Sequence, residues 1–546
     1  MKIPSLTLNF VVKNETLEKI QKWFEMHASF LVVFILSIIS VYTFIHYDLN
    51  GLGLSYNDAR SHLDIGRRVV EGLKPGLAQI GSVWLPLPHF LMIPTVWIDY
   101  MWHSGLAGAT QSMISFIAVG IIIYSFTKKL GVGLLGRLFA VLVFVANLNI
   151  LYLQSTAMTE LLLLATMTAG AYYLLEWART DEVLPLIKSA FFIMASTLTR
   201  YDGWFLLVVA TAIIAIIVIR RGGYKEAEAK VLTFATLGGF GIALWFLWNL
   251  VIFKDPLYFA FGPFSARVQQ EQLAQAGELV TEGNLILSTK LYLYSLVYNI
   301  YVYPLLLGVF GFILLLTSKL KREIKIASLA LITPLFFNIL ALYFGHSVIF
   351  IQGISGKTWF NVRYGIMMAP AIAIFSGFLV DRLKPLKWPI IGLFLFTTFF
   401  AFTSQDAVTI DDARVGSSQK NVSEVSGWLS RNAKDKDGFI LISAASHDAI
   451  IFSSGLPMKK FIHEGTGAYW QSATTSPDRW ARWIVMRTHD DNDLSWKFTS
   501  RSGALSKYNL VESYPFADIY ELDEVYLGSL NTEAVFGNKA DLKNVR

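Results

Sequence analysis

Repeated long apolar stretches are the feature of this sequence that most limits its fold. A helix needs about 20 apolar residues to cross the hydrocarbon core of a bilayer. By that criterion the sequence predicts about eleven membrane spans, at residues 28–47, 106–126, 133–150, 158–177, 184–199, 203–219, 231–252, 291–316, 326–345, 363–380 and 387–403. Because a bilayer offers no water to exposed backbone groups, we expect one polytopic α-helical membrane body.

The composition agrees with a membrane protein. Of the 546 residues, 54% are hydrophobic and 16% are charged, whereas soluble domains average about 25% charged residues. The sequence has no Cys, which excludes disulfides, thiolate metal sites and Cys nucleophiles. In a membrane protein a net charge of +6 reflects basic cytoplasmic loops, so we expect no nucleic-acid partner.

Basic residues cluster in every second connection between the predicted spans. These residues are Lys128, Lys129 and Arg137; Arg179 and Lys188; Arg220, Arg221, Lys225 and Lys230; Lys319, Lys321, Arg322 and Lys325; and Arg382, Lys384 and Lys387. Such connections face the cytoplasm. The pattern predicts a multi-pass protein of the plasma or inner membrane, with residues 1–27 in the cytoplasm and the C-terminus outside.

Three segments are then predicted to lie outside the cell. Residues 48–105 form a long loop that contains an amphipathic helix at the membrane surface. Residues 254–290 form a glutamine-rich loop suited to a mobile lid. Residues 404–546 form a small extracytoplasmic α/β domain, which leaves 28–403 as the membrane body. Within the α/β domain we expect strands at 438–444, 459–463, 482–487 and 517–521 and a helix at 447–453.

The first candidate site follows the first span, in residues 56–62 (YNDARSH). An outward-facing carboxylate such as Asp58, close to a His, can deprotonate an acceptor hydroxyl. The alternative is structural, because Ser55 and Asp58 have the spacing of a helix capping box. The charged residues that follow are expected to form a solvated ionic face: Asp64, Arg67, Arg68 and Glu71.

Three further candidate segments lie at the starts of later spans on the same side. Glu160 either complements the helix dipole or belongs to a polar pocket, because an unpaired carboxylate beside an apolar run is costly. Arg200 and Asp202 join two short apolar runs, so they form either a snorkelling pair or part of a polar cavity. Arg363, in the segment 357–364 (KTWFNVRY), can bind a phosphate through two hydrogen bonds, or it can anchor the helix at the interface.

In order and on one side of the membrane, these residues resemble motifs of the GT-C superfamily of polytopic glycosyltransferases. Asp58 matches the acidic residue of the first external loop in that superfamily. The resemblance covers roughly residues 28–403. It includes the proline-rich segment 84–89 (WLPLPH), Thr159-Glu160, the junction 199–203 (TRYDG), the loop opening 255–259 (DPLYF) and Arg363-Tyr364. The Trp-Trp-Asp motif of oligosaccharyltransferases is absent from the sequence.

The resemblance implies an inverting glycosyltransferase that moves a sugar from a polyprenyl-phosphate donor to an acceptor hydroxyl outside the cell. The acceptor would be a glycan, a lipid or a protein. The implied catalytic residues are Asp58 as general base, Glu160 and Asp202, and a divalent Mg or Mn ion, if one takes part, would bind Asp58 and Glu160. The implied substrate-binding residues are Arg60, His62, His89, Arg200, Tyr201, Lys357, Arg363 and Tyr364.

Two other functions fit parts of the sequence. A transporter or flippase of lipid-linked saccharides also needs charges within the membrane, and it predicts inverted repeats and helices broken near the midplane. A non-catalytic assembly scaffold would use the C-terminal domain to bind partners. The ionisable cluster at one surface favours the transferase.

Overall fold

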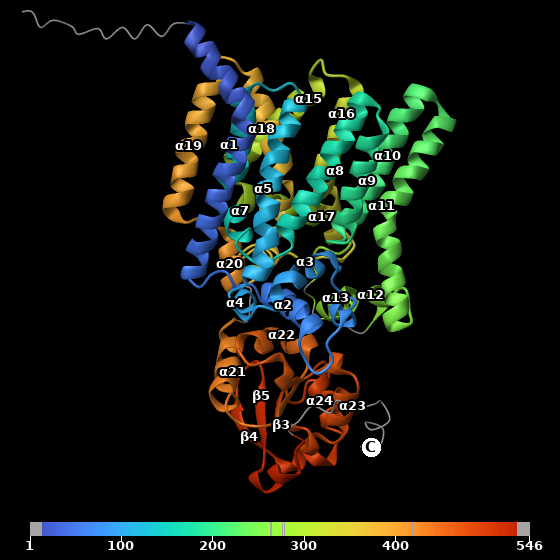
Figure 1. The fold of residues 1–546 in the computed structure, drawn as a ribbon, viewed down its shortest axis with the longest axis vertical. Coiled ribbons are helices and arrows are strands. Elements are labelled where there is room, and N and C mark those ends of the chain that lie inside the picture. The colour runs from blue at the N-terminus through green and yellow to red at the C-terminus, as the bar shows by residue number, and fades with distance from the viewer. Residues whose placement is uncertain (1–13, 263–264, 276, 278, 416–418, 532–546) are drawn as a thin grey trace, which may run out of the picture.

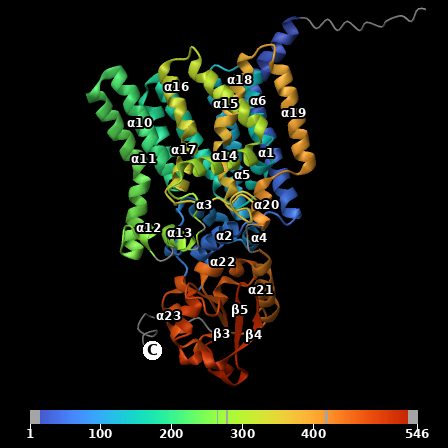
Figure 2. The ribbon, with the colours of Figure 1, turned by 180° about the vertical axis from the view of Figure 1, so that it is seen from behind.

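The computed structural model describes residues 14–262, 265–275, 277, 279–415 and 419–531. A tall body of packed helices stands above a smaller α/β part that is built from the C-terminal residues (Figure 1). The first helix, α1, begins at the end of the body that is farthest from the sheet, and the view from behind agrees (Figure 2). The chain is therefore a multi-pass membrane protein whose C-terminal part lies against one end of the helical body.

Eight helical stretches within the described residues are long and apolar enough to cross a membrane. Six of the eleven predicted spans correspond closely to long helices, and two more continue through a short break. The stretches are formed by α1 (Asn14–Leu49), α5 (Leu106–Lys129), α8 (Glu160–Thr180), α10 (Asp202–Gly222), α11 (Tyr224–Phe253), α16 with α17 (Arg322–Ser328 and Thr333–Tyr343), α18 (Ala369–Arg382) with the 3-10 turn that precedes it, and α19 with α20 (Lys387–Ser404 and Val408–Val415).

The predicted number of eleven spans is not confirmed, because three predicted spans take another form. The span at 133–150 is two helices, α6 (Leu134–Val145) and α7 (Leu148–Leu153), separated where the Asn147 side chain caps α7. The span at 184–199 is α9 (Val183–Thr197), whose 15 residues fall short of a bilayer crossing.

The third departure is a sharp bend in the span expected at 291–316. The chain forms α14 (Leu285–Ile300) and α15 (Val302–Thr317), whose axes differ by 111°. The break is at Tyr301, whose φ is +64°. Pro304 lies in the first turn of α15, where its missing N–H leaves no helical hydrogen bond unmade. Counting this pair as one crossing gives nine in the described residues.

Short helices cover the end of the body that faces the sheet. The predicted amphipathic helix is α2 (Asn57–Val70), followed by α3 (Leu87–Val96) and α4 (Asp99–His103). The glutamine-rich loop contains α12 (Tyr258–Phe261) and α13 (Ala266–Gln275). The lid role of that loop remains a prediction.

The C-terminal part is a five-stranded mixed sheet in the order β2-β1-β3-β5-β4. The strands β2, β1 and β3 are parallel, whereas β3, β5 and β4 are antiparallel. The elements are α21 (Gln419–Asn432), β1 (Phe439–Ile442), α22 (Ala444–Ser453), β2 (Phe461–Ile462), α23 (Ala468–Thr475), β3 (Ala481–Met486), α24 (Leu494–Thr499), β4 (Tyr508–Ser513) and β5 (Asp518–Leu522).

Successive side chains of a strand point to opposite faces of the sheet, so each face packs into a hydrophobic core of its own. Ile440 and Val485 point to the side of α21 and α22, where they join the large hydrophobic core. Leu441 and Ile484 point to the opposite side and pack with Trp470 of α23. This period of two is the pattern that predicted four of the five strands. The fifth strand, β4, was missed because it is an edge strand with a largely exposed surface.

The ionic face expected on α2 is not solvated, because α2 packs between α3 and α22. Asp64 is fully buried, and Arg68 forms an ion pair with Asp448 of α22 at 3.2 Å. Arg67 forms ion pairs with Glu71 and Asp99. The prediction of a solvated face was wrong because the C-terminal part covers this helix, a contact between segments about 380 residues apart.

Candidate active site

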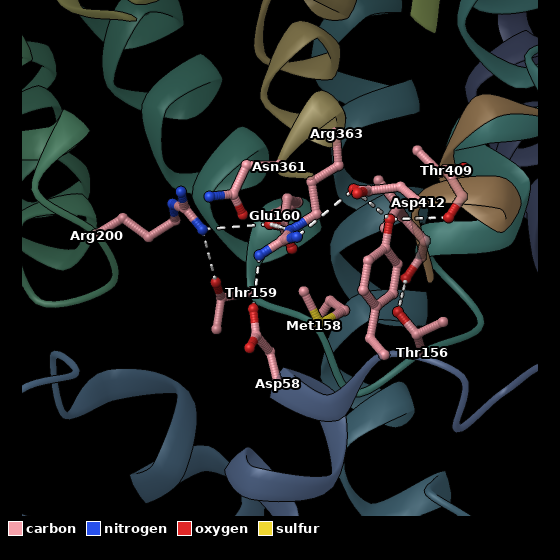
Figure 3. A network of polar contacts seen from close by, with 12 residues as sticks. Asp58, Thr156, Met158, Thr159, Glu160, Arg200, Asn361, Arg363, Thr409 and Asp412 are labelled. Carbon is pink, nitrogen blue, oxygen red and sulfur yellow. Dashed lines mark hydrogen bonds and ion pairs between the residues drawn. The ribbon is translucent and has the colours of Figure 1, made fainter. Parts of the chain in front are cut away.

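Two arginines and four carboxylates meet at the end of the membrane body that faces the sheet. They come from five separate segments of the chain: Asp58 from α2, Glu160 from α8, Arg200 and Asp202 from the α9–α10 junction and the start of α10, Arg363 from the 3-10 turn before α18, and Asp412 from α20. Glu160 lies between the two guanidinium groups, Asp58 lies below Arg363, and Asp412 lies to its side (Figure 3). The sequence placed five of these six residues on one side of the membrane.

Arg363 is the centre of the network. Its Nη2 lies 2.6 Å from Oδ2 of Asp58, its Nε lies 3.0 Å from Oε1 of Glu160, and its Nη1 lies 3.6 Å from Oδ2 of Asp412. The side chain is buried, so it is no surface anchor. Asn361, with φ +55°, turns the chain into the 3-10 turn Val362–Met368, which directs Arg363 inward.

Glu160 joins the two arginines. Its Oε1 accepts hydrogen bonds from Nε of Arg363 at 3.0 Å and from Nη1 of Arg200 at 3.2 Å. The carboxylate is 0% exposed, and its Oε2 has no hydrogen-bond partner among the residues that the structure describes. Glu160 opens α8, where the helix dipole also favours a negative charge. Glu160 therefore both complements the helix dipole and belongs to a polar cluster, so the two interpretations of its sequence position are compatible.

Arg200 and Asp202 do not snorkel into water. The Nε of Arg200 lies 3.5 Å from Oδ2 of Asp202, whose side chain is buried. The ring of Tyr364 lies beside both arginines, with its centroid 4.8 Å from the guanidinium carbon of Arg200 and 5.4 Å from that of Arg363. The two cations are thus held close to each other by a shared carboxylate and a shared aromatic ring.

Asp58 differs from the other carboxylates in its access to solvent. Its side chain is 43% exposed, whereas that of Glu160 is 0% exposed. Asp58 is the second residue of α2, and the residue that precedes the helix makes no side-chain capping bond. The capping box suggested by Ser55 and Asp58 is therefore not formed. The Asp58 carboxylate is therefore partly accessible from outside the protein.

A neutral histidine pair lies one turn further along α2. Nδ1 of His62 lies 2.9 Å from Nε2 of His89, and the ring centroids of His62 and Trp84 are 4.3 Å apart. Burial lowers the pKa of His62 to about 3, with smaller contributions from Arg200 and Arg363. Burial likewise lowers the pKa of His89. Both rings are therefore uncharged, and they link α2 to α3.

The remaining predicted substrate-binding residues lie outside the ion-pair network. Arg60 is buried, and its Nη1 lies 3.4 Å from Oδ1 of Asn57. The hydroxyl of Tyr201 lies 3.4 Å from the carbonyl oxygen of Val83. Lys357 is exposed on the loop before the 3-10 turn. Substrate contacts by these residues remain predictions.

Sequence reasoning missed Asp412 and gave no role to Tyr56. Asp412 follows the last span, in the stretch assigned to the extracytoplasmic domain, and it forms no motif. Tyr56 is the first residue of the candidate segment 56–62, and its ring centroid lies 4.9 Å from the guanidinium carbon of Arg363. The available signal was an acidic pair, Asp411-Asp412, placed shortly after an apolar run.

The site does not fit a divalent metal ion. The two residues assigned to a metal, Asp58 and Glu160, both bind the guanidinium of Arg363, so that a positive charge already lies between them. Among the described residues no group of three or more His, Asp or Glu side chains is arranged to hold a metal. The chemistry proposed below therefore relies on the arginines.

Comparison with known proteins supports the fold. No protein-family model matches the sequence, and no curated protein is significantly similar to it. Among solved structures, apo ArnT from Cupriavidus metallidurans aligns with a TM-score of 0.53 at 12% identity, covering 88% of this chain and 97% of ArnT. The structure of ArnT bound to undecaprenyl phosphate aligns with a TM-score of 0.52 over the same share.

A second solved structure shares the architecture. The archaeal oligosaccharyltransferase AglB from Archaeoglobus fulgidus, in complex with an inhibitory peptide and a dolichol-phosphate, aligns with a TM-score of 0.50 at 11% identity. The alignment covers 85% of this chain and 70% of AglB. Such low identities show a common fold. The predicted polytopic helical membrane body with a small C-terminal sheet domain is confirmed.

Proposed function

We propose that this protein is a glycosyltransferase that moves one sugar from a polyprenyl-phosphate donor to an acceptor hydroxyl at the external face of the membrane. The observation that carries the proposal is the pair of arginines joined by Glu160 and placed beside the partly exposed carboxylate of Asp58. The fold adds support, because solved proteins of this shape bind undecaprenyl phosphate or dolichol-phosphate. The isoprenoid would lie along the membrane-facing helices, with its phosphate at the arginines.

The donor phosphate would take the place of Asp58 on Arg363. Nη2 of Arg363 is bound to the partly exposed Asp58, whereas Nε and Nη1 face the buried Glu160 and Asp412, so a phosphate oxygen would bind at Nη2. When the phosphate binds, Asp58 loses its ion-pair partner, and its carboxylate is free to take a proton. Donor binding would therefore prepare the carboxylate for the acceptor.

The transfer step follows from this arrangement. Asp58 accepts the proton of the acceptor hydroxyl while that oxygen forms a bond to the anomeric carbon of the sugar. The bond between the anomeric carbon and the phosphate oxygen breaks, and its electron pair stays on the phosphate. Arg363 and Arg200 stabilise the charge that develops there. Attack opposite the leaving phosphate inverts the anomeric configuration.

The other site residues would act through these groups. Glu160 and Asp202 are proposed as positioning residues, because each binds an arginine and both are buried. The neutral pair of His62 and His89 would hold α2, and therefore Asp58, against α3. The membrane face toward which the sheet is directed would be the external one, as the basic connections predict.

The transporter alternative has less support. It predicts helices broken near the membrane midplane. The one broken pair in the described residues, α14 and α15, bends at Tyr301, whose hydroxyl donates to the carbonyl of Asp406 near the sheet-facing end. The ion pairs include Asp58 of α2, which lies at the same end of the body (Figure 1). A site at one surface suits a transferase better than a carrier with alternating access.

A transfer assay tests the proposal. The purified full chain would be incubated with a panel of sugar-linked polyprenyl phosphates and candidate hydroxyl acceptors, and release of polyprenyl phosphate would be followed by mass spectrometry. We expect one donor to be consumed with an inverted glycosidic bond in the product. Failure of the whole panel, together with no affinity for polyprenyl phosphate, would contradict the proposal.

A further inference from the structure

The segment that links the last long helix to the C-terminal domain supplies a side chain to the candidate active site. Asp412 lies in α20, between α19 and the sheet, and it is buried. Its Oδ2 lies 3.6 Å from Nη1 of Arg363 and 3.1 Å from the hydroxyl of Tyr56. Figure 3 shows Asp412 on the side of Arg363 that is away from Arg200.

Three hydrogen bonds of Thr409 fix α20 in this place. The amide and the hydroxyl of Thr409 both donate to Oδ1 of Asn149, at 3.0 and 2.9 Å. The carbonyl of Thr409 lies 2.8 Å from the hydroxyl of Tyr56. Nδ2 of Asn149 in turn donates to the carbonyl of Asn299 at the end of α14. The linker is therefore hydrogen-bonded to α7 and to Tyr56, and α7 is in turn bonded to α14.

Tyr56 connects Asp412 and Arg363 in two ways. Burial raises the pKa of Tyr56 well above its ordinary value, so the phenol keeps the proton that it shares between Asp412 and Thr409. The face of the same ring lies 4.9 Å from the guanidinium carbon of Arg363, a distance at which a cation and an aromatic ring attract each other. Arg363 thus has a carboxylate at its Nη1 edge and an aromatic ring on one face.

The three carboxylates around Arg363 are not equivalent. Asp58 is partly exposed and can yield its place to another anion, whereas Glu160 and Asp412 are buried and cannot be displaced by a ligand from outside. A guanidinium held only by Asp58 and Glu160 could turn toward an incoming phosphate. The third carboxylate, the buried Asp412, prevents that rotation. Nη2 is then the nitrogen at which a phosphate can replace Asp58.

We propose that Asp412 is a positioning residue that, together with Tyr56, holds the guanidinium of Arg363 so that a lipid phosphate replaces Asp58 without displacing the arginine. This inference rests on the proposed function, because it assigns a role toward the same donor. It also makes the linker of the C-terminal domain part of the donor site. The domain would then influence donor affinity without contacting the donor itself.

The test measures the dissociation constant of undecaprenyl phosphate for the detergent-purified full chain by calorimetry. We expect Asp412→Asn to weaken binding on the order of ten-fold, because a hydrogen-bonded charge is removed from a buried group. Asp412→Glu should restore most of the affinity, since it returns the carboxylate. The matched control is Asp411→Asn, which alters the exposed neighbour in the same helix and should bind as the wild type does.

Tyr56→Phe keeps the ring against Arg363 and removes only the hydroxyl. It should weaken phosphate binding in the same direction as Asp412→Asn but by a smaller factor, and it keeps the test decisive if Asp412→Asn does not fold. Unchanged or tighter binding by Asp412→Asn, or a loss that Asp412→Glu leaves uncorrected, would overturn the inference while leaving the proposed function in place. A wild-type protein that binds no polyprenyl phosphate would overturn both.

Discussion

Oδ2 of Asp58 lies 2.6 Å from Nη2 of Arg363, across 305 positions of the sequence. One partner begins a short helix at the membrane surface, and the other precedes a helix that is almost wholly buried. The contact places a partly exposed carboxylate on a buried cation. It supplies both parts that the proposed reaction needs, which are a base that an acceptor can reach and a cation that can bind a phosphate.

Replacement of Arg363 by Lys tests the phosphate site. Lysine keeps the positive charge but has no planar guanidinium, so it cannot bind Glu160, Asp412 and a phosphate through separate nitrogens. We expect Arg363→Lys to weaken undecaprenyl phosphate binding by about ten-fold or more. Calorimetric titration measures this, and an affinity equal to that of the wild type would remove Arg363 from the donor site.

Glu160→Gln tests whether one carboxylate organises both arginines. The amide keeps the size of the side chain but leaves Arg200 and Arg363 facing each other without a shared counter-charge. Removing one partner from a buried ionic group costs about 3–5 kcal/mol, so we expect a clear fall in melting temperature and loss of most transfer activity. The exposed Glu182→Gln serves as control. A Glu160→Gln variant as stable as this control would show that the arginines need no bridge.

The interface between α2 and α22 should respond to pH. Burial raises the pKa of Asp64, and it raises the pKa of Asp448 to about 6, against the lowering effect of Arg68. In the unfolded chain both acids release their protons near pH 4. The folded protein therefore holds more protons between these values, so this interface is strongest below about pH 4 and weakens as the pH rises through about 6.

Asp64→Asn imitates the protonated acid and should flatten this decline. The comparison is of melting temperatures from pH 4 to pH 7 for the wild type and Asp64→Asn, with the exposed Asp491→Asn as control. We expect the wild type and the control to lose more stability over this range than Asp64→Asn does. Parallel curves for all three proteins would mean that Asp64 is ionised in the folded state.

Apolar length and basic loops predicted much of the membrane body from the sequence. The bend at Tyr301 escaped prediction because the residues on both sides are apolar and the left-handed residue is not a Gly. The short lengths of α6 and α9 were not predicted either. An apolar run shows how far a buried segment extends, but it does not show whether one straight helix forms the whole segment. Length and hydropathy therefore overestimated the number of complete crossings.

The candidate site was predicted in part because its residues begin helices on one side of the membrane. Asp58, Glu160, Arg200 and Arg363 each follow or precede an apolar run, so topology alone brought them to one surface. The sequence could not show which of these residues form ion pairs with each other, because every ion pair but one joins segments that are distant in the chain. Asp412 could not be assigned, since nothing local shows that α20 folds back onto α7.

The same limit explains the error on α2. Its charged residues have the spacing of an exposed helical face, and only the docking of α22 reveals that they are covered. Asp64 shows the consequence, since an acid expected in water is fully buried beside Asp448. A pattern of polar residues on one helix predicts which side faces away from its own apolar neighbours, and it does not predict whether another domain lies there.

The measurement that tests the central claim most directly is the transfer rate of Asp58→Asn, determined together with its affinity for undecaprenyl phosphate. Asparagine keeps the size of the side chain but cannot accept the proton of the acceptor hydroxyl. If Asp58 is the general base, turnover falls by at least about 10²-fold, while donor binding and melting temperature stay close to those of the wild type and of the exposed control Asp411→Asn. Turnover of Asp58→Asn equal to that of the wild type would contradict the account.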